Sequence, residues 1–154
     1  MLFYNRTYFN KELKKEISKY KRDDISFCFI IIDIDFFKKI NDSYGHQVGD
    51  EILTELTSII KKRSRTTDTL ARWGGEEFVQ LLPSTTFENA KLIAENIRIM
   101  IQEHTFSNSI KITCSFGISQ IREEDSNEDL IKRADVALYI AKSKGKNSVE
   151  GQKQ

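Results

Sequence analysis

The sequence has few cysteines, a single proline and almost no net charge. Its two cysteines, Cys28 and Cys114, lie in apolar runs, with neither a Cys-x-x-Cys spacing nor a histidine partner. This pattern excludes a disulfide framework and argues against a zinc site. It predicts buried, reduced thiols and therefore a cytoplasmic protein.

Charge of one sign and long apolar runs are also lacking. The 24 basic and 23 acidic residues leave a net charge of +1, so no overall field points to nucleic acid or to an anionic membrane. The longest apolar run, Phe27–Ile32, is far shorter than the roughly 20 residues of a membrane helix. We expect no nucleic-acid partner and no membrane insertion, and any phosphate binding must be local.

What is present fits one globular domain over residues 1–154, because 154 residues with 39% hydrophobic content suffice for one core. Helical spacing of apolar residues, with capping signals at Asn5, Thr85-x-x-Glu88 and Ser126-x-x-Asp129, predicts amphipathic helices. Strands are predicted over 26–35, 71–82 (a hairpin), 110–121 and 148–151. The order favours an α/β (α+β) fold, with a mixed sheet of about five strands flanked by helices.

The hairpin carries an unusual turn, Gly74-Gly75-Glu76-Glu77. Adjacent glycines between two strand-like runs are typical of a tight hairpin, because glycine accepts positive φ angles. Neighbouring carboxylates repel each other unless a cation or basic group lies between them. The pair Glu76 and Glu77 is therefore the first indication of a metal site.

A second acidic pair follows the predicted central strand. Asp33 and Asp35 would share one face if the strand stayed regular, and could then coordinate a hard cation. Asp35 could instead cap a helical turn at Phe36. Asp33 directly follows an apolar run, where a carboxylate is costly unless it is paired or coordinated. A cation shared by Asp33 and Glu76 would explain both features, and Mg²⁺ suits such oxygen ligands.

Four segments together resemble a known family. They are Asp33-Ile34-Asp35-Phe36-Phe37-Lys38-Lys39-Ile40-Asn41-Asp42, Gly45-His46-x-x-Gly49-Asp50, Gly74-Gly75-Glu76-Glu77-Phe78 and Lys142-x-x-Gly145-Lys146-Asn147. In this order and spacing they resemble the signatures of the GGDEF-domain diguanylate cyclases. The resemblance covers nearly the whole chain and implies a fold of the nucleotidyl cyclase and polymerase-palm type.

The resemblance implies that two GTP molecules condense to cyclic di-GMP with release of pyrophosphate. Two domains face each other as a homodimer, and the 3′-hydroxyl of one GTP attacks the α-phosphate of the other. Asp33, the carbonyl of Ile34 and Glu76 would hold the metal, with two ions, Mg²⁺ or Mn²⁺, in each GTP half-site. Glu76 or Glu77 would act as the base, with Glu76 expected as the metal ligand.

By the same resemblance, Asn41 and Asp50 would bind the guanine edge and His46 would lie near the nucleotide. A carboxylate can accept from guanine N1–H and N2–H₂, and an amide can meet the remaining edge atoms. The alternatives are ordinary: Asn41 as a turn former and Asp50 as a first-turn helix residue.

The triphosphate would lie against the backbone amides around Phe36 and Phe37, and Gly74 and Gly75 would allow a nucleotide to approach the backbone closely. Lys142 and Lys146 would add positive charge from the last helix. Lysines near a helix C-terminus are, in the alternative interpretation, simply solvated.

Arg65-x-x-Asp68 resembles the family's inhibitory product-binding motif and would hold cyclic di-GMP. The arginine fork suits phosphate or a guanine edge. The alternative is a plain surface salt bridge. Arg72 lies between this motif and the Gly-Gly turn, so it could relay product binding.

One departure from the family pattern lies at the start of the chain. Members usually show Asp-x-Leu-Thr before an Asn-Arg pair, and here only Met1–Tyr4 precede Asn5-Arg6. We therefore expect a fragment without its N-terminal regulatory or dimerisation region. The alternative to an enzyme is a non-catalytic module that binds cyclic di-GMP or GTP as a receptor or dimerisation domain, although such a receptor needs none of the metal ligands.

Overall fold

A six-stranded mixed sheet forms the centre of the molecule in the computed structural model, which describes residues 3–151. The strands are β1 (Phe3–Tyr4), β2 (Cys28–Ile34), β3 (Thr69–Arg72), β4 (Glu77–Leu82), β5 (Cys114–Gln120) and β6 (Val149–Gly151), in the order β1-β3-β4-β2-β5-β6. The edge pairs β1–β3 and β5–β6 are parallel and the inner pairs are antiparallel. The predicted mixed sheet is confirmed, and the two-residue β1 adds one edge strand to it.

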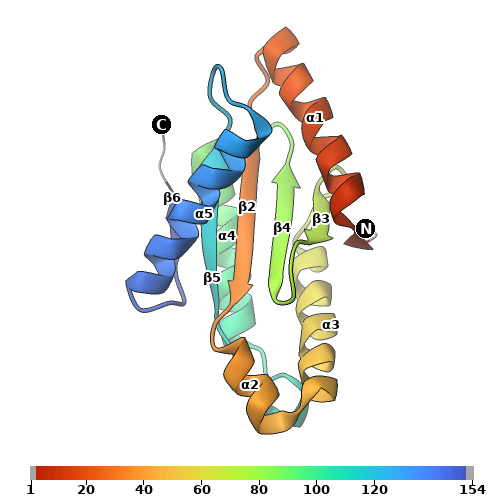
Figure 1. Ribbon diagram of the computed structural model, residues 1–154, viewed down its shortest axis with the longest axis vertical. Helices are drawn as coiled ribbons and strands as arrows, with labels where there is room; N and C mark the ends of the chain where they lie inside the picture. Colours follow the sequence, from red (N-terminus) through yellow and green to blue (C-terminus); the bar gives the residue numbers. More distant parts are fainter. Residues whose placement is uncertain (1–2, 152–154) are drawn as a thin grey trace.

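Helices cover both faces of this sheet (Figure 1). They are α1 (Arg6–Asp23), α2 (Phe37–Tyr44), α3 (His46–Lys62), α4 (Phe87–Glu103) and α5 (Asn127–Ser143), with a short 3₁₀ turn at Ser107–Ser109. Helices α1 and α5 pack on one face, and α3 and α4 on the other. Helix α2 extends beyond the end of β2 at the edge where the acidic residues gather.

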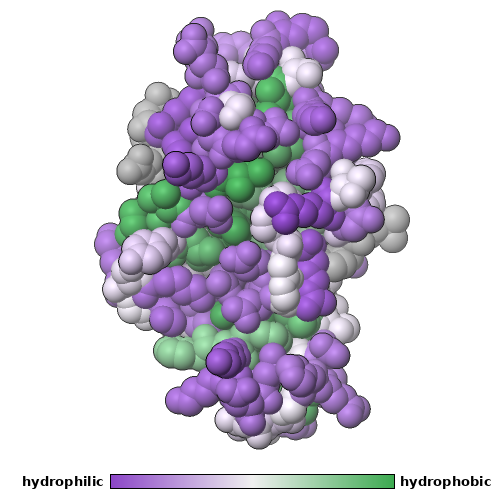
Figure 2. Space-filling model, viewed as in Figure 1, coloured by the Kyte–Doolittle hydropathy of each residue, from purple (hydrophilic) through white to green (hydrophobic). Residues whose placement is uncertain are grey.

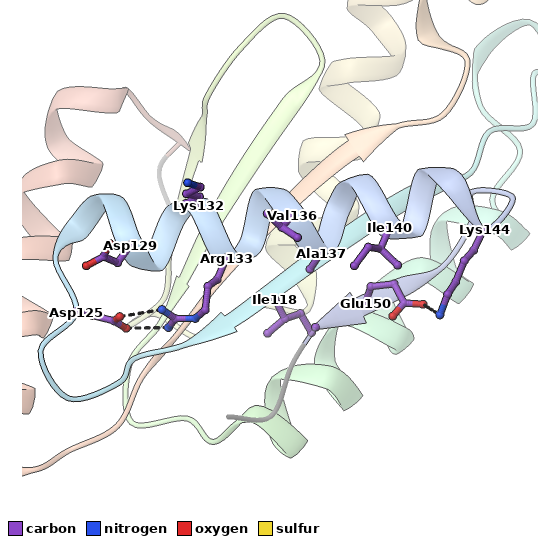
Figure 3. Close-up of a pocket in the computed structure, with 11 residues that line it drawn as sticks. Ile118, Asp125, Asp129, Lys132, Arg133, Val136, Ala137, Ile140, Lys144 and Glu150 are labelled. Carbon is purple, nitrogen blue, oxygen red and sulfur yellow. Dashed lines mark hydrogen bonds and ion pairs between the residues drawn. The ribbon is translucent and has the colours of Figure 1, made fainter.

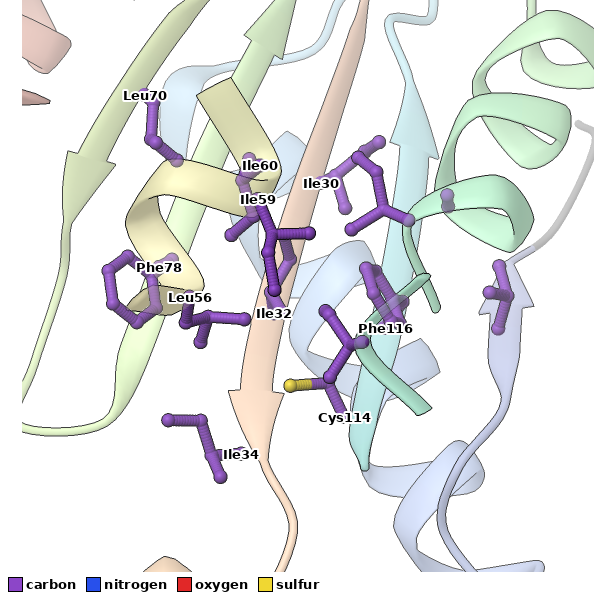
Figure 4. Packing of buried hydrophobic residues seen from close by; sticks show 14 of the residues in the cluster. Ile30, Ile32, Ile34, Leu56, Ile59, Ile60, Leu70, Phe78, Cys114 and Phe116 are labelled. Atoms are coloured by element: carbon purple, nitrogen blue, oxygen red, sulfur yellow. The ribbon is translucent and has the colours of Figure 1, made fainter. Parts of the chain in front are cut away.

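Strand β2 separates two apolar layers by the alternation of its side chains. Ile30, Ile32 and Ile34 face α3 and α4, as Figure 4 shows for the residues around Leu56 and Phe116. Phe29 and Ile31 face α1 and α5. Asp33 has the parity of this second set, so its side chain is directed to the α1 and α5 face.

The caps were predicted well with one exception. Asn5 accepts the backbone N–H of Tyr8, and Ser126 forms a full capping box with Asp129. Helix α4, however, is capped by Thr86 and not by Thr85. The hydroxyl of Thr85 is occupied, because it donates to Pro83 O and accepts from Arg65 Nη2.

Cys28 and Cys114 are both buried and free, as the sequence predicted. Burial raises the pKa of the Cys28 thiol to about 12 and that of Cys114 well above its usual value. Neither thiol is activated for chemistry.

Over residues 3–151 the structure contains no helix with the length and apolarity needed to span a bilayer.

Candidate functional site

The acidic residues converge at one edge of the sheet. Asp33 pairs across the antiparallel ladders with Glu77 of β4 and with Ser115 of β5, and directly opposed residues share a face. The backbone N–H of Ile34 donates to the carbonyl of Glu76 at 3.5 Å. Residues from three strands and the hairpin therefore meet at the end of β2.

Asp33 carries an unpartnered oxygen. Its Oδ1 atom is buried and has no hydrogen-bond partner in the structure, and burial, with the nearby charges of Glu76 and Glu77 adding to it, raises the pKa of Asp33 to about 7 despite the opposing effect of Lys142. An orphaned carboxylate oxygen beside other acids is what an absent cation would leave. The donor set fits Mg²⁺, which takes one or two carboxylates and completes its shell with phosphate oxygens and water.

The side chains at this edge are too few to complete the coordination shell of a cation by themselves. Within residues 3–151, no three side chains of His, Cys, Asp or Glu form a cluster able to hold a metal. A cation at this edge would therefore need oxygen atoms from a substrate or from water to complete its shell, as Mg²⁺ commonly does.

Asp35 is neither a helix cap nor an open ligand, which corrects both interpretations drawn from the sequence. Helix α2 has no side-chain cap, and the buried carboxylate of Asp35 accepts four hydrogen bonds. Its donors are Thr113 Oγ1, Ser115 Oγ, Lys142 Nζ and the backbone N–H of Asn147. Burial opposes its charge, yet the hydrogen bonds from Lys142, Thr113 and Ser115 lower the pKa of Asp35. Asp35 is therefore an ionised anchor for the surrounding segments.

Lys142 reaches this cluster from the last turn of α5. Its Nζ lies 2.8 Å from Asp35 Oδ1, 3.6 Å from Asp33 Oδ2 and 3.5 Å from the carbonyl oxygen of Ile34. The interpretation of Lys142 as a solvated surface lysine is wrong, because the side chain is partly buried and ion-paired. Lys146 lies beyond the helix, with its ammonium 5.0 Å from the ring centroid of Phe36.

The hairpin turn does not need glycine for its backbone angles, contrary to the expectation from sequence. Neither Gly74 nor Gly75 has a φ in the left-handed region. A Cβ added to Gly75 would meet nothing within 4 Å. The space beside Gly75 is open, so the absence of a side chain there suits the close approach of a ligand or a partner.

Arg72 holds this turn closed. Its Nε donates to the carbonyl of Gly74 at 3.2 Å and its Nη2 to that of Gly75 at 2.5 Å. The next residue, Trp73, packs edge-on against Phe9 of α1 and lies 4.0 Å below the guanidinium of Arg6. Arg72 thus fixes the turn through its two glycine carbonyls, and Trp73 packs the turn against helix α1.

Helix α2 presents a free N-terminus near the acidic edge. Phe36 precedes it with φ 59° and ψ 28°, a left-handed conformation that is uncommon for an aromatic residue. Phe36 is 62% exposed. With no side-chain cap, the first backbone N–H groups of α2, starting at Phe37, are available to an anion.

Asn41 and Asp50 lie on the packed helices α2 and α3. The Oδ1 atom of Asn41 is buried without a partner, and a Cβ at Gly49 would overlap it. Gly49 therefore lets α3 approach Asn41 closely. Asp50 and His46 are exposed on α3, and the structure gives no contact that assigns a role to either.

Arg65 and Asp68 lie elsewhere, at the far end of β4. Asp68 is buried and accepts the backbone N–H and the guanidinium of Arg65, which also donates to Pro83 O and Thr85 Oγ1. The pair is therefore more than a surface salt bridge. Six strand residues separate this end from the hairpin, or roughly 20 Å at the usual rise.

A groove of about 490 Å³ runs between α5 and strands β5 and β6 (Figure 3). Ile118, Val136 and Ile140 line it between the ion pairs Arg133–Asp125 and Lys144–Glu150. Figure 2 shows the apolar band that crosses this side of the molecule. None of the site residues predicted from the sequence lines this groove.

Sequence reasoning missed Thr113 and Ser115, which hold Asp35 in place, and named Asn147 only as part of the Lys142–Asn147 segment, without a role. A signal was present, because Thr113 and Ser115 are polar residues two apart at the start of an apolar strand. Period-two spacing places both on one face, where they meet Asp35.

Comparison with known proteins identifies the family. The family model described as "Diguanylate cyclase, GGDEF domain" matches residues 2–148. The chain is 38% identical to the diguanylate cyclase DgcP of Pseudomonas aeruginosa over 95% of its length, and 38% identical to the response regulator PleD of Caulobacter vibrioides over 96%. It spans only 22% and 34% of the lengths of these two relatives.

Solved structures agree. The active GGEEF domain of a diguanylate cyclase from Vibrio cholerae matches with a TM-score of 0.93 and 34% identity, covering 99% of both chains. The GGDEF domain of DgcB from Caulobacter crescentus, solved in complex with c-di-GMP, matches with a TM-score of 0.92 and 30% identity, covering 97% of this chain and 91% of that one. With the acidic edge, the Gly-Gly-Glu-Glu turn and this match over nearly its whole length, the chain belongs to the GGDEF-domain family of diguanylate cyclases.

Proposed function

We propose that the chain is a catalytic diguanylate cyclase domain, which condenses two GTP molecules into cyclic di-GMP and releases pyrophosphate. The observation that carries this proposal is the orphaned, buried oxygen of Asp33 beside the glutamates of the hairpin. A domain that only binds a finished product has no need of such an unpaired carboxylate. The free thiols Cys28 and Cys114 support a cytoplasmic setting.

The chain's own groups suit the triphosphate. The uncapped start of α2 offers backbone N–H groups from Phe37 onward, while Lys142 and Lys146 add positive charge on the same side. The open space beside Gly75 lets the nucleotide lie against the hairpin. Together these groups hold a phosphate chain against the acidic edge without blocking it.

Guanine recognition falls to the α2–α3 pair. Asp50 accepts from guanine N1–H and N2–H₂, and the amide group of Asn41 meets the remaining edge atoms. His46 lies at the start of α3, near the nucleotide. Adenine would present an acceptor to Asp50 and would be rejected.

Asp33, the Ile34 carbonyl and Glu76 would hold the cations, which we propose to be Mg²⁺, replaceable by Mn²⁺, with two in each GTP half-site. When bound, such ions neutralise the charge that builds on the leaving pyrophosphate and lower the pKa of the attacking hydroxyl. Glu77 faces the same edge as Asp33, which supports Glu77 over Glu76 as the proposed base for the hydroxyl proton.

One domain provides half of this arrangement. The 3′-hydroxyl that attacks must come from a second GTP held by a second copy of the chain, so catalysis requires a homodimer with a two-fold axis between the sites. The open surface beside Gly75 is compatible with an active site completed by a second copy.

The test is synthesis of cyclic di-GMP by the chain fused to a parallel coiled coil, incubated with GTP and Mg²⁺ and analysed by chromatography. We expect product from the fusion and none from its Glu76→Ala variant, while Glu123→Ala, an exposed acid in a distant loop, stays active. Absence of cyclic di-GMP from the folded fusion would refute the proposal that the chain is a diguanylate cyclase.

We also propose that cyclic di-GMP binds at Arg65. A cavity of about 520 Å³ adjoins this residue, lined also by Tyr4, Tyr8 and Ser84. The Arg65 side chain is 48% exposed whereas that of Asp68 is 2% exposed. Arg65 therefore meets the ligand, and Asp68 orients it.

Calorimetric titration of cyclic di-GMP into the Glu76→Ala fusion measures this site in isolation from synthesis. Arg65→Ala should abolish the heat of binding, while Arg63→Ala, at an exposed arginine that does not line this cavity, serves as the control and should retain it. Unchanged binding in Arg65→Ala would move the product site elsewhere.

A further inference from the structure

Lys142 already places a positive charge against the oxygens proposed to hold a cation. Its ammonium is held by Asp35 at 2.8 Å, and it lies 3.6 Å from Asp33 Oδ2 and 3.5 Å from the Ile34 carbonyl oxygen. Asp33 and the Ile34 carbonyl are two of the three protein groups of the proposed metal site, and Glu76 is the third. Lys142 and a divalent cation therefore share two ligands.

The two oxygens of Asp33 differ in this respect. Oδ2 faces Lys142, while Oδ1 is buried and unpartnered. The carboxylate is thus only half compensated by the lysine. It keeps one oxygen free for a cation.

We propose that Lys142 is a built-in counter-ion of the cation site, which weakens binding of a divalent ion until a nucleotide triphosphate offers its ammonium another partner. This inference rests on the proposed function, since it takes the acidic edge as the cation site and the triphosphate as the substrate group. It adds a role for Lys142 that phosphate binding alone does not give.

The physical argument is repulsion between like charges at short range. A dication on Asp33 would lie within a few ångströms of the ammonium in a partly buried site, where screening is weak. Lys142 cannot simply withdraw into solvent, because Asp35 holds it and is itself held by Thr113 and Ser115. Its flexible four-carbon stem can, however, turn the charge toward a phosphate in the same site.

This arrangement makes the nucleotide a condition for tight metal binding. Without nucleotide, the lysine and the cation compete for Asp33 and Ile34. With a triphosphate bound, the negative charge of the phosphates accommodates both cations. An empty domain therefore does not hold a divalent ion tightly.

The experiment measures Mn²⁺ alone, without nucleotide, by the electron paramagnetic resonance signal of the free ion in titrations of the folded chain. We expect Lys142→Met to bind Mn²⁺ roughly 10-fold more tightly than the wild-type chain, a change equivalent to about 1.4 kcal/mol. Lys144→Met is the matched control, because Lys144 lies two residues away and pairs with Glu150. It should bind Mn²⁺ like the wild type.

Two further variants keep the test decisive. Lys142→Gln retains a hydrogen-bond donor for Asp35 without the charge, so it replaces Lys142→Met if the methionine variant does not fold, and should show the same gain. Adding Asp33→Asn to either variant should remove the gain and place the ion at Asp33. Equal or weaker Mn²⁺ binding by the folded Lys142 variants would overturn the proposal.

The readout separates this inference from the proposed function. Tighter Mn²⁺ binding in Lys142→Gln, with no cyclic di-GMP made by the wild-type fusion, would support the counter-ion role of Lys142 and contradict the proposed enzymatic function. Synthesis of cyclic di-GMP by the wild-type fusion, with no change in Mn²⁺ affinity in Lys142→Gln, would support the proposed enzymatic function and contradict the counter-ion role of Lys142.

Discussion

Asp33 and Glu77 are directly opposed across strands β2 and β4, so that two carboxylates share one face at the edge of the sheet. Burial is the main effect that raises the pKa of both groups, and neighbouring acids add to it. The fold therefore holds two carboxyl groups in surroundings that disfavour their charged forms. This arrangement lowers the stability of the domain without ligand, and a ligand bound at this edge would restore that stability.

Replacing Asp33 by asparagine should stabilise the metal-free domain at pH 8. Asparagine fills the same volume without the cost of a buried charge next to Glu77. We expect a gain on the order of 1–3 kcal/mol in the free energy of unfolding, measured by urea denaturation with EDTA. Millimolar Mg²⁺ with GTP should then stabilise the wild-type chain more than the variant. A loss of stability in Asp33→Asn without metal would contradict this account.

Alanine at Gly75 should leave folding intact and impair the site. A Cβ there meets nothing in the free domain, so the melting temperature should change by no more than about 2 °C. Affinity for GTP, measured by calorimetry with Mg²⁺, should fall at least several-fold.

The matched control for Gly75→Ala is Gly117→Ala in β5, where a Cβ would overlap Ala134 O and the backbone nitrogen of Leu138. This second change should destabilise the domain by roughly 2 kcal/mol or more through overpacking. If Gly75→Ala melted as early as Gly117→Ala, the glycine would serve the fold and not the ligand.

Removing the Arg72 side chain should loosen the turn more than it destabilises the domain. The guanidinium bonds to two carbonyls at an exposed position, so Arg72→Ala should cost about 1 kcal/mol or less. Synthesis of cyclic di-GMP by the coiled-coil fusion should nevertheless fall about 10-fold or more, because the turn that precedes Glu76 loses the bonds to its two glycine carbonyls.

Arg72→Lys serves as the graded comparison, since one ammonium cannot reproduce the planar fork on both carbonyls. Its activity should lie between those of the wild type and Arg72→Ala. Full activity in Arg72→Ala would show that the turn holds its geometry without the clamp.

Glu55 should give the domain a pH-dependent increment of stability. Although burial opposes the charge, hydrogen bonds from Ser107 and His104 lower the pKa of Glu55. A carboxylate with a lowered folded-state pKa stabilises the fold above its unfolded value, near pH 4.5, and loses that contribution as the pH falls through the folded-state value. Glu55→Gln should therefore cost about 1 kcal/mol at pH 7 and close to nothing at pH 3.

Urea denaturation at both pH values measures this difference, with Glu51→Gln on the exposed surface of the same helix as control. Glu55 fastens α3 to the 3₁₀ turn through the backbone and hydroxyl of Ser107. An equal loss for Glu55→Gln at pH 3 and pH 7 would show that the contact stabilises by packing and not by charge.

Local patterns predicted most of the fold. The apolar run ending at Asp33 was a buried strand, Ser126-x-x-Asp129 was a capping box, and Gly145 ends α5 with a φ of +114°. These features depend on a few neighbouring residues, which is why the sequence reveals them. Strand β1 escaped prediction because its two residues are ordered by pairing with β3, 67 positions away.

The sequence indicated which acidic residues gather at one edge of the sheet, but not the contacts that hold them there. The sequence indicated an acidic edge at Asp33 and the hairpin, and the register places Asp33 beside Glu77. It could not show that Asp35 is saturated, because all four donors come from residues 78 to 112 positions later in the chain. Such contacts carry no local signal.

The saturation of Asp35 also has a consequence for the timing of synthesis. Its donors include Lys142 and Asn147, and a ribosome delivers these residues after β2 and the hairpin. A growing chain that has released β2 and the hairpin still lacks the groups that fix the acidic edge. The site can therefore form only when translation has passed Asn147, so an unfinished chain already carries the glutamates of the hairpin but not the anchored site that would use them.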